Sequence, residues 1–162
     1  MSKHKRPETV RLSWRRQIGV FGGLGILLVS GLVWLYLDNF VRIPGEFGLV
    51  KSPMEPLFMK IHGAFAMIIL TVMGTLFPIH IKGAWHRDRN RLSGFGMAIV
   101  MMIMVVTGYG LYYAAGEEMR HVISLAHWIT GVVIPFVLGI HVFMGKRAIA
   151  KRNAKNLQLI HQ

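Results

Sequence analysis

Four long apolar stretches constrain the fold of this chain more than any other feature of its sequence. They cover residues 18–37, 57–81, 94–115 and 121–145, which is more than half of the 162 residues. A helix needs about 20 apolar residues to cross a hydrocarbon layer of roughly 30 Å. Each stretch reaches that length, and 53% of the chain is hydrophobic. The sequence therefore predicts an all-α integral membrane four-helix bundle with up-down-up-down topology.

The basic residues lie mostly on one side of this predicted bundle. All of the 19 lysine and arginine residues except Arg42, Lys51, Lys60 and Arg120 precede the first stretch, separate the second from the third, or follow the fourth. Basic segments stay in the cytoplasm, so both termini are expected there. The net charge of +12 thus accompanies membrane spans. We expect lipid contact and no nucleic-acid binding.

Three regions follow from this pattern. Residues 1–16 form a basic cytoplasmic segment, residues 17–147 form the four-span membrane domain, and residues 148–162 form a basic cytoplasmic tail. The connection over residues 38–56 contains Pro44, Pro53 and Pro56 and is predicted to be a turn-rich loop. The chain has no cysteine, which excludes disulfides, iron–sulfur ligation and covalently attached haem.

Two histidine pairs mark the second and fourth stretches. His62 and His80 are 18 residues apart, which is five whole helical turns, and His127 and His141 are 14 apart, about 40° short of four turns. In the alternating topology the two stretches run in the same direction, so His62 lies level with His127 and His80 lies level with His141. Imidazole is a common axial ligand of haem iron. The pattern predicts two non-covalent b-type haems with bis-His ligation, one in each leaflet, so that all four histidines bind metal.

Other interpretations of these residues stay open. A histidine inside a membrane span also occurs as a packed, hydrogen-bonded group or in a proton path, and metal transport is a further alternative. Lysine and arginine near the predicted sites are candidates for binding the haem propionates, although they also suit plain interfacial anchoring. These cations are Lys60 and Arg120 near the outer site and Lys82, Arg87, Lys146 and Arg147 near the inner site.

The segments that carry the histidines also resemble a known group of proteins. They read Lys-Ile-His-Gly at 60–63, Pro-Ile-His at 78–80, Leu-Ala-His-Trp-Ile-Thr-Gly at 125–131 and Gly-Ile-His at 139–141. In these segments the chain resembles the bacterial four-helix dihaem b-type cytochromes. That group includes the cytochrome b subunits of hydrogenases and formate dehydrogenases and the flavinylation-associated cytochromes. The resemblance implies quinone-linked electron transfer across a bacterial inner membrane, with the four histidines as axial ligands.

The functional hypothesis is electron transfer between a quinone pool and a redox partner protein. The short connections favour an electron-transfer subunit of an oxidoreductase complex over an independent enzyme, with an outer-facing or complex-forming redox protein as the partner. One alternative is a stand-alone quinone-linked haem oxidoreductase that acts on superoxide or ferric iron. Another is a structural subunit of a membrane complex without a cofactor.

Overall fold

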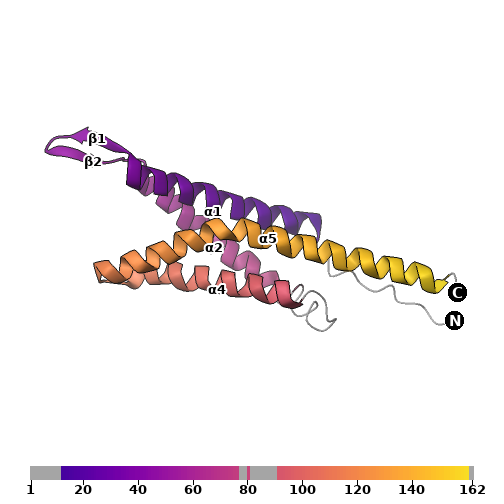
Figure 1. Ribbon diagram of the computed structural model, residues 1–162. Coiled ribbons are helices and arrows are strands. Elements are labelled where there is room, and N and C mark those ends of the chain that lie inside the picture. The colour runs from indigo at the N-terminus through magenta and orange to yellow at the C-terminus, as the bar shows by residue number, and fades with distance from the viewer. Residues whose placement is uncertain (1–11, 77–79, 81–90, 161–162) are drawn as a thin grey trace. The chain divides into compact units, whose positions relative to one another are not determined.

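Two pairs of long helices make up the chain. The computed structural model describes residues 12–76, 80 and 91–160, and it separates into one unit over residues 1–83 and another over 84–162. Helices α1 (Trp14–Phe40) and α2 (Glu55–Leu76) belong to the first unit (Figure 1). Helices α4 (Arg91–Tyr113) and α5 (Glu117–Ile160) belong to the second. All four are long and apolar enough to cross a membrane, which confirms the predicted all-α fold with four membrane-length helices.

Close contacts between α1 and α2 set the register of the first unit. Gly23 of α1 lies against Ile69 of α2, and Ser30 lies against His62. The second contact lies seven residues later on α1 and seven residues earlier on α2 than the first, so the two helices are antiparallel. Small residues let helix backbones approach closely where the hydrophobic effect between spans is weak. Gly23 and Ile69 are both buried, and they mark the tightest point of this pair.

Replacing Gly23 with alanine is expected to destabilise the first helix pair. A Cβ atom there would clash with the Ile69 side chain, whose Cγ1 would lie only 2.9 Å away. Overpacking of this kind costs about 1–3 kcal/mol. The adjacent Gly22→Ala is the matched control, because no described atom lies within 4 Å of its Cβ position. The midpoint of denaturant unfolding in detergent should fall for Gly23→Ala alone, and equal midpoints for both variants would contradict the assigned contact.

The second unit is antiparallel by the same criterion. Ile123 packs over Gly110, near the connection between α4 and α5, and Met104 contacts Gly131 further along. The second contact lies six residues earlier on α4 and eight residues later on α5 than the first. Within each pair the helices therefore alternate in direction, as predicted.

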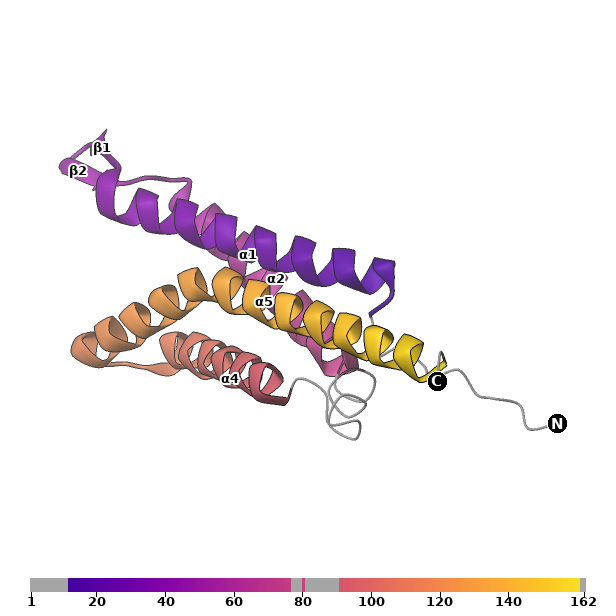
Figure 2. The ribbon, with the colours of Figure 1, turned by 45° about the vertical axis from the view of Figure 1, so that its right-hand side comes forward.

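Helix α5 is much longer than its predicted span. The apolar span was predicted over residues 121–145 and a basic tail over 148–162, and the helix continues through that tail to Ile160. The segment after Gly145 contains no glycine or proline and begins with good helix formers, including Ala148 and Ala150. Pro135 lies inside the helix and cannot donate a backbone hydrogen bond. The helix changes direction along its length, as both views show (Figures 1 and 2).

The predicted loop over 38–56 contains a β-hairpin. Strands β1 (Arg42–Gly45) and β2 (Gly48–Lys51) pair antiparallel, with Ile43 opposite Val50. Gly48 has a φ of 125°, a conformation that residues with a Cβ rarely adopt. Gly45 also needs to be a glycine, since a Cβ there would lie 2.8 Å from Val50 Cγ1. Turn chemistry thus builds a small sheet at the end of the first helix pair.

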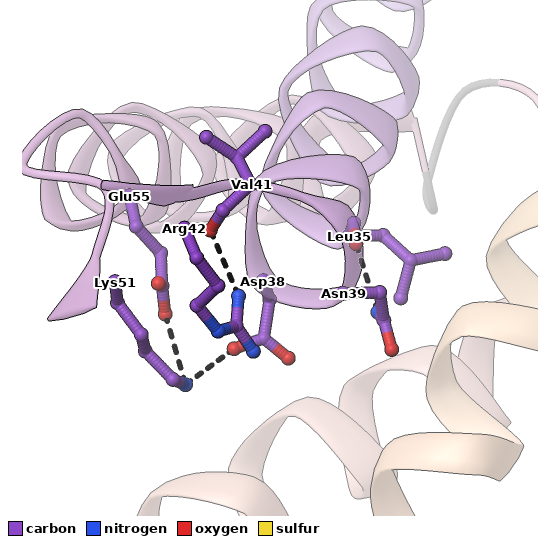
Figure 3. Close-up of polar contacts among 7 residues, drawn as sticks. All are labelled: Leu35, Asp38, Asn39, Val41, Arg42, Lys51 and Glu55. Atoms are coloured by element: carbon purple, nitrogen blue, oxygen red, sulfur yellow. Dashed lines mark hydrogen bonds and ion pairs between the residues drawn. The ribbon is translucent and has the colours of Figure 1, made fainter. Parts of the chain in front are cut away.

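A lysine in the hairpin binds acidic groups on both helices of its unit. The Lys51 ammonium donates to the Asp38 carboxylate in the last turns of α1 and lies 3.5 Å from Glu55 Oε1 at the start of α2 (Figure 3). The hydrogen bond to Asp38 raises the pKa of Lys51. The side chain is 59% exposed, so the energetic contribution of these pairs is small.

The stabilisation from Lys51 should depend on pH. Because its pKa is raised in the folded chain, the contribution is complete below the unfolded value of about 10.4 and is lost as pH rises through the folded value. We expect Lys51→Met to remove this pH dependence and to lower the free energy of unfolding at pH 8 by up to about 1 kcal/mol. Unfolding midpoints between pH 8 and 12 measure it, with the exposed Lys60→Met as control. A profile unchanged in Lys51→Met would contradict the assignment.

Candidate functional site

His62 is hydrogen-bonded to the neighbouring helix of its own unit. It lies half-buried on α2, and its Nδ1 is 3.0 Å from the Leu27 carbonyl oxygen and 3.1 Å from Ser30 Oγ, both on α1. The Ser30 hydroxyl in turn donates to the same Leu27 carbonyl at 3.1 Å. The imidazole is therefore held at a defined level between the two helices.

His127 makes an equivalent contact in the second unit. Its Nδ1 lies 2.9 Å from Thr107 Oγ1 on α4. The Thr107 hydroxyl donates to the Ile103 carbonyl at 2.6 Å, with the Met104 carbonyl at 3.3 Å. The shorter distance favours donation of the single Thr107 proton to the Ile103 carbonyl, which leaves the hydroxyl oxygen able to accept from an Nδ1–H of His127.

His141 repeats the arrangement further along the same helix pair. Its Nδ1 lies 3.1 Å from Ser93 Oγ on α4. His127 and His141 thus both face α4 from one continuous helix, which confirms that the two residues share one face of α5. Sequence periodicity had indicated this stripe from the 14-residue spacing.

A glycine follows each of these hydroxyl residues and lies against the same imidazole. A Cβ on Gly31 would be 3.2 Å from His62 Cε1, and a Cβ on Gly108 would be 3.3 Å from His127 Cε1. At Gly94 the corresponding distance to His141 Cε1 is 3.9 Å, an ordinary van der Waals contact. The absence of a side chain at Gly31 therefore leaves space for the ring of His62, a candidate haem ligand.

His80 lies beyond the described end of α2. The helix ends at Leu76, residues 77–79 lie outside the described part of the chain, and His80 itself is half-buried. The shared helix face of His62 and His80 therefore stays a prediction. The pairings of His62 with His127 and of His80 with His141 join the two units, and they also stay predictions.

The candidate propionate-binding cations that the structure describes lie in the first two turns of a helix, at Lys60 of α2 and Arg120 of α5, or within α5 after its apolar part, at Lys146 and Arg147. Lys60, Arg120, Lys146 and Arg147 are exposed. The Arg147 guanidinium lies 5.8 Å from the centre of the Phe143 ring, one turn earlier on α5. The role of these cations in binding propionates stays a prediction. Lys82 and Arg87 fall outside the described residues, as does Pro78 before His80.

No cluster of three or more His, Cys, Asp or Glu side chains able to hold a metal ion occurs in the described residues. A bis-His haem site needs no such cluster, because it takes one imidazole from each side of the porphyrin. The relevant protein features are single histidines with a fixed orientation.

The sequence analysis missed the hydroxyl residues that contact the histidines. Ser30, Ser93 and Thr107 each precede a glycine in an apolar helix. Ser93 and Thr107 are 14 residues apart, the same spacing as His127 and His141 on the antiparallel partner. This matched spacing could have indicated the hydroxyl residues. It does so only once α4 and α5 are known to pair, because the spacing alone does not say which helices face each other.

Comparison with known proteins gives one distant similarity. A cytochrome b561 domain-containing protein of Arabidopsis thaliana is 19% identical over 140 residues. The alignment covers 86% of this chain and 52% of the relative, so the chain spans about half the length of the relative that it matches. No protein family matches the chain, and no solved structure matches it either.

The four helices of membrane length in the described residues indicate a multi-pass membrane protein. The similarity found is to a cytochrome b561 domain, and not to the hydrogenase, formate dehydrogenase or flavinylation-associated cytochromes that the histidine segments resemble.

Proposed function

We propose that the chain is a dihaem b-type cytochrome that carries electrons across a bacterial inner membrane between a quinone pool and a redox partner. His62 and His127 would hold the outer haem, and His80 and His141 the inner one. The proposal combines the distant similarity to a cytochrome b561 domain protein with the positions of the histidines on membrane-length helices.

The observation that carries this proposal is the hydrogen bonding of His62. A backbone carbonyl oxygen can only accept a hydrogen bond, so the Nδ1 that faces Leu27 at 3.0 Å must carry the proton. The neutral imidazole then has its lone pair on Nε2. Histidines that bind metal commonly use one ring nitrogen for the metal and donate the other N–H to an acceptor. His62 is thus prepared for an iron ligand on Nε2.

The contacts of Thr107 lead to the same assignment for His127. The Thr107 proton is engaged with the Ile103 carbonyl at 2.6 Å, so the hydroxyl oxygen accepts from the Nδ1–H of His127. The lone pair of this imidazole also lies on Nε2. Both predicted ligands of the outer haem therefore have the tautomer that iron requires.

The haem and the protein would have different roles in electron transfer. A bound haem would supply one-electron exchange between ferric and ferrous iron, with its potential set by the ligands and their surroundings. The histidines would hold the iron from two helices, and the apolar side chains would keep water away. Lys60, Arg120 and Arg147 would offer positive charge to the propionates at the span ends.

The short connections favour the role of a subunit. Within the described residues, the segment between α1 and α2 holds only the small hairpin, and α4 joins α5 through three residues. Neither segment could hold a flavin or an iron–sulfur cluster domain. Substrate oxidation would therefore take place on a partner, with this chain exchanging electrons with quinone or quinol.

Haem analysis of the purified protein tests this proposal. We expect a red preparation with a b-type reduced-minus-oxidised spectrum and two haems per chain. A folded but colourless protein would overturn the proposal and favour a structural subunit. One haem per chain would overturn the dihaem assignment.

A further inference from the structure

Three pairs of adjacent residues make the same contact with three different histidines. Ser30-Gly31 contacts His62, Thr107-Gly108 contacts His127, and Ser93-Gly94 contacts His141. In every case the hydroxyl meets Nδ1 and the glycine lies beside Cε1. The repetition in both helix pairs points to a common task.

We propose that these hydroxyl–glycine pairs are positioning elements that fix the orientation and tautomer of the haem ligands and thereby set the potential of the haems. The inference rests on the proposed function. It concerns residues of α1 and α4, the two helices that carry none of the four predicted ligands.

Both members are needed in the pairs that contact His62 and His127. The hydroxyl fixes one ring atom, which leaves the imidazole able to rotate about that point. The glycine lets the Cε1 edge of the ring lie close to the helix, where a Cβ at Gly31 or Gly108 would come within 3.2 to 3.3 Å. Each of these two rings is therefore restrained at two adjacent atoms, Nδ1 and Cε1.

Other threonines show that such contacts are not general in these helices. Thr71 and Thr75 of α2 are exposed, and their hydroxyls donate to carbonyls of their own helix, Met67 at 3.0 Å and Val72 at 2.7 Å. Neither threonine is followed by a glycine, unlike the three hydroxyl residues that contact histidines. Thr107 also lies within hydrogen-bond distance of its own helix, but its oxygen is in addition 2.9 Å from His127 Nδ1.

The hydrogen-bond acceptor at Nδ1 affects the iron through the ring. An acceptor makes the imidazole a stronger electron donor at Nε2. Stronger donation favours ferric iron and lowers the potential, which depends on hydrogen bonding around the ligand. Removal of the acceptor should therefore raise the potential of the haem concerned.

The hydroxyl contacts of the two outer ligands can be removed one at a time. His62 faces the Leu27 carbonyl as well as Ser30, so Ser30→Ala leaves one strong acceptor in place. For His127, loss of the Thr107 hydroxyl removes a contact of 2.9 Å to Nδ1. Each loss should raise the potential of the haem concerned.

Redox titration of the haem-loaded full-length chain tests this effect. Thr107→Val keeps the side-chain shape and removes the hydroxyl, and we expect two haems to remain while one gains about tenfold in its ferrous-to-ferric ratio at fixed potential. That ratio corresponds to about 59 mV for one electron. Thr107→Ser should restore the wild-type value, Ser30→Ala should also raise the potential of one haem, and Thr71→Val should leave both potentials unchanged. An unchanged potential in Thr107→Val with both haems bound would overturn the inference.

The glycines allow a second test that keeps every hydroxyl. Gly108→Ala should rotate the His127 ring and change the low-spin ferric signal in electron paramagnetic resonance. Gly96→Ala on the same helix is the matched control, because no described atom lies within 4 Å of its Cβ position. Identical spectra for these two variants and the wild type would overturn the positioning role. A wild-type protein without haem would instead overturn the proposed function itself, so the two failures are distinguishable.

Discussion

Replacement of His127 by leucine is expected to lower the haem content of the purified protein from two haems per chain to one. The predicted outer haem would lose one of its two axial ligands, and a single imidazole does not hold a non-covalent haem as tightly as a pair. The inner haem should persist, because His80 and His141 are unchanged. Haem absorbance per mole of protein measures the result.

Two further variants sharpen this experiment. His62→Leu should give the same loss, and the double variant should lose no more than either single variant, because both histidines would serve one haem. His121→Leu is the matched control, since His121 is exposed on the same helix and lies off the face that carries His127 and His141. Retention of both haems in His62→Leu and His127→Leu would rule out this outer pair.

Replacement of His141 by leucine is expected to leave the outer haem in place and to stop electron transfer across the membrane. His127 and His141 are separated by 14 residues, about 21 Å along the helix. Without the inner haem, most of a hydrocarbon layer of roughly 30 Å would contain no redox centre. The outer haem should still be reduced at its own side.

Sealed vesicles that contain the protein and enclose ferricyanide allow this measurement. Reduced quinone added outside should drive loss of the ferricyanide colour in the wild type and in His121→Leu. In His141→Leu the rate should fall to that of protein-free vesicles, while the outer haem still becomes reduced. An undiminished rate in this variant would contradict a path through two haems.

Local sequence patterns accounted for the helices but not for their full extent. Hydropathy located all four membrane-length helices, because a span must satisfy its backbone hydrogen bonds internally and expose apolar side chains. It did not indicate that the basic tail from residue 148 continues the last helix, where most residues are polar or small yet still favour helix. It also missed the hairpin, whose strands are only four residues each.

The candidate site divides in the same way. The histidines stand out in the sequence because imidazole is rare and costly within a membrane span. Ser30, Ser93 and Thr107 do not stand out, because serine and threonine are ordinary in such helices and usually bond to their own backbone. Their relation to the histidines depends on how two helices align.

The sequence by itself determined which segments are apolar helices and which imidazoles lie on them, since both properties are written in local composition and in the 3.6-residue period. Only the tertiary structure decided which hydroxyl meets which imidazole. That match depends on the register between antiparallel helices, and the register is set by close contacts such as that between Gly23 and Ile69. Such contacts join residues far apart in the chain, where no local pattern specifies the partner.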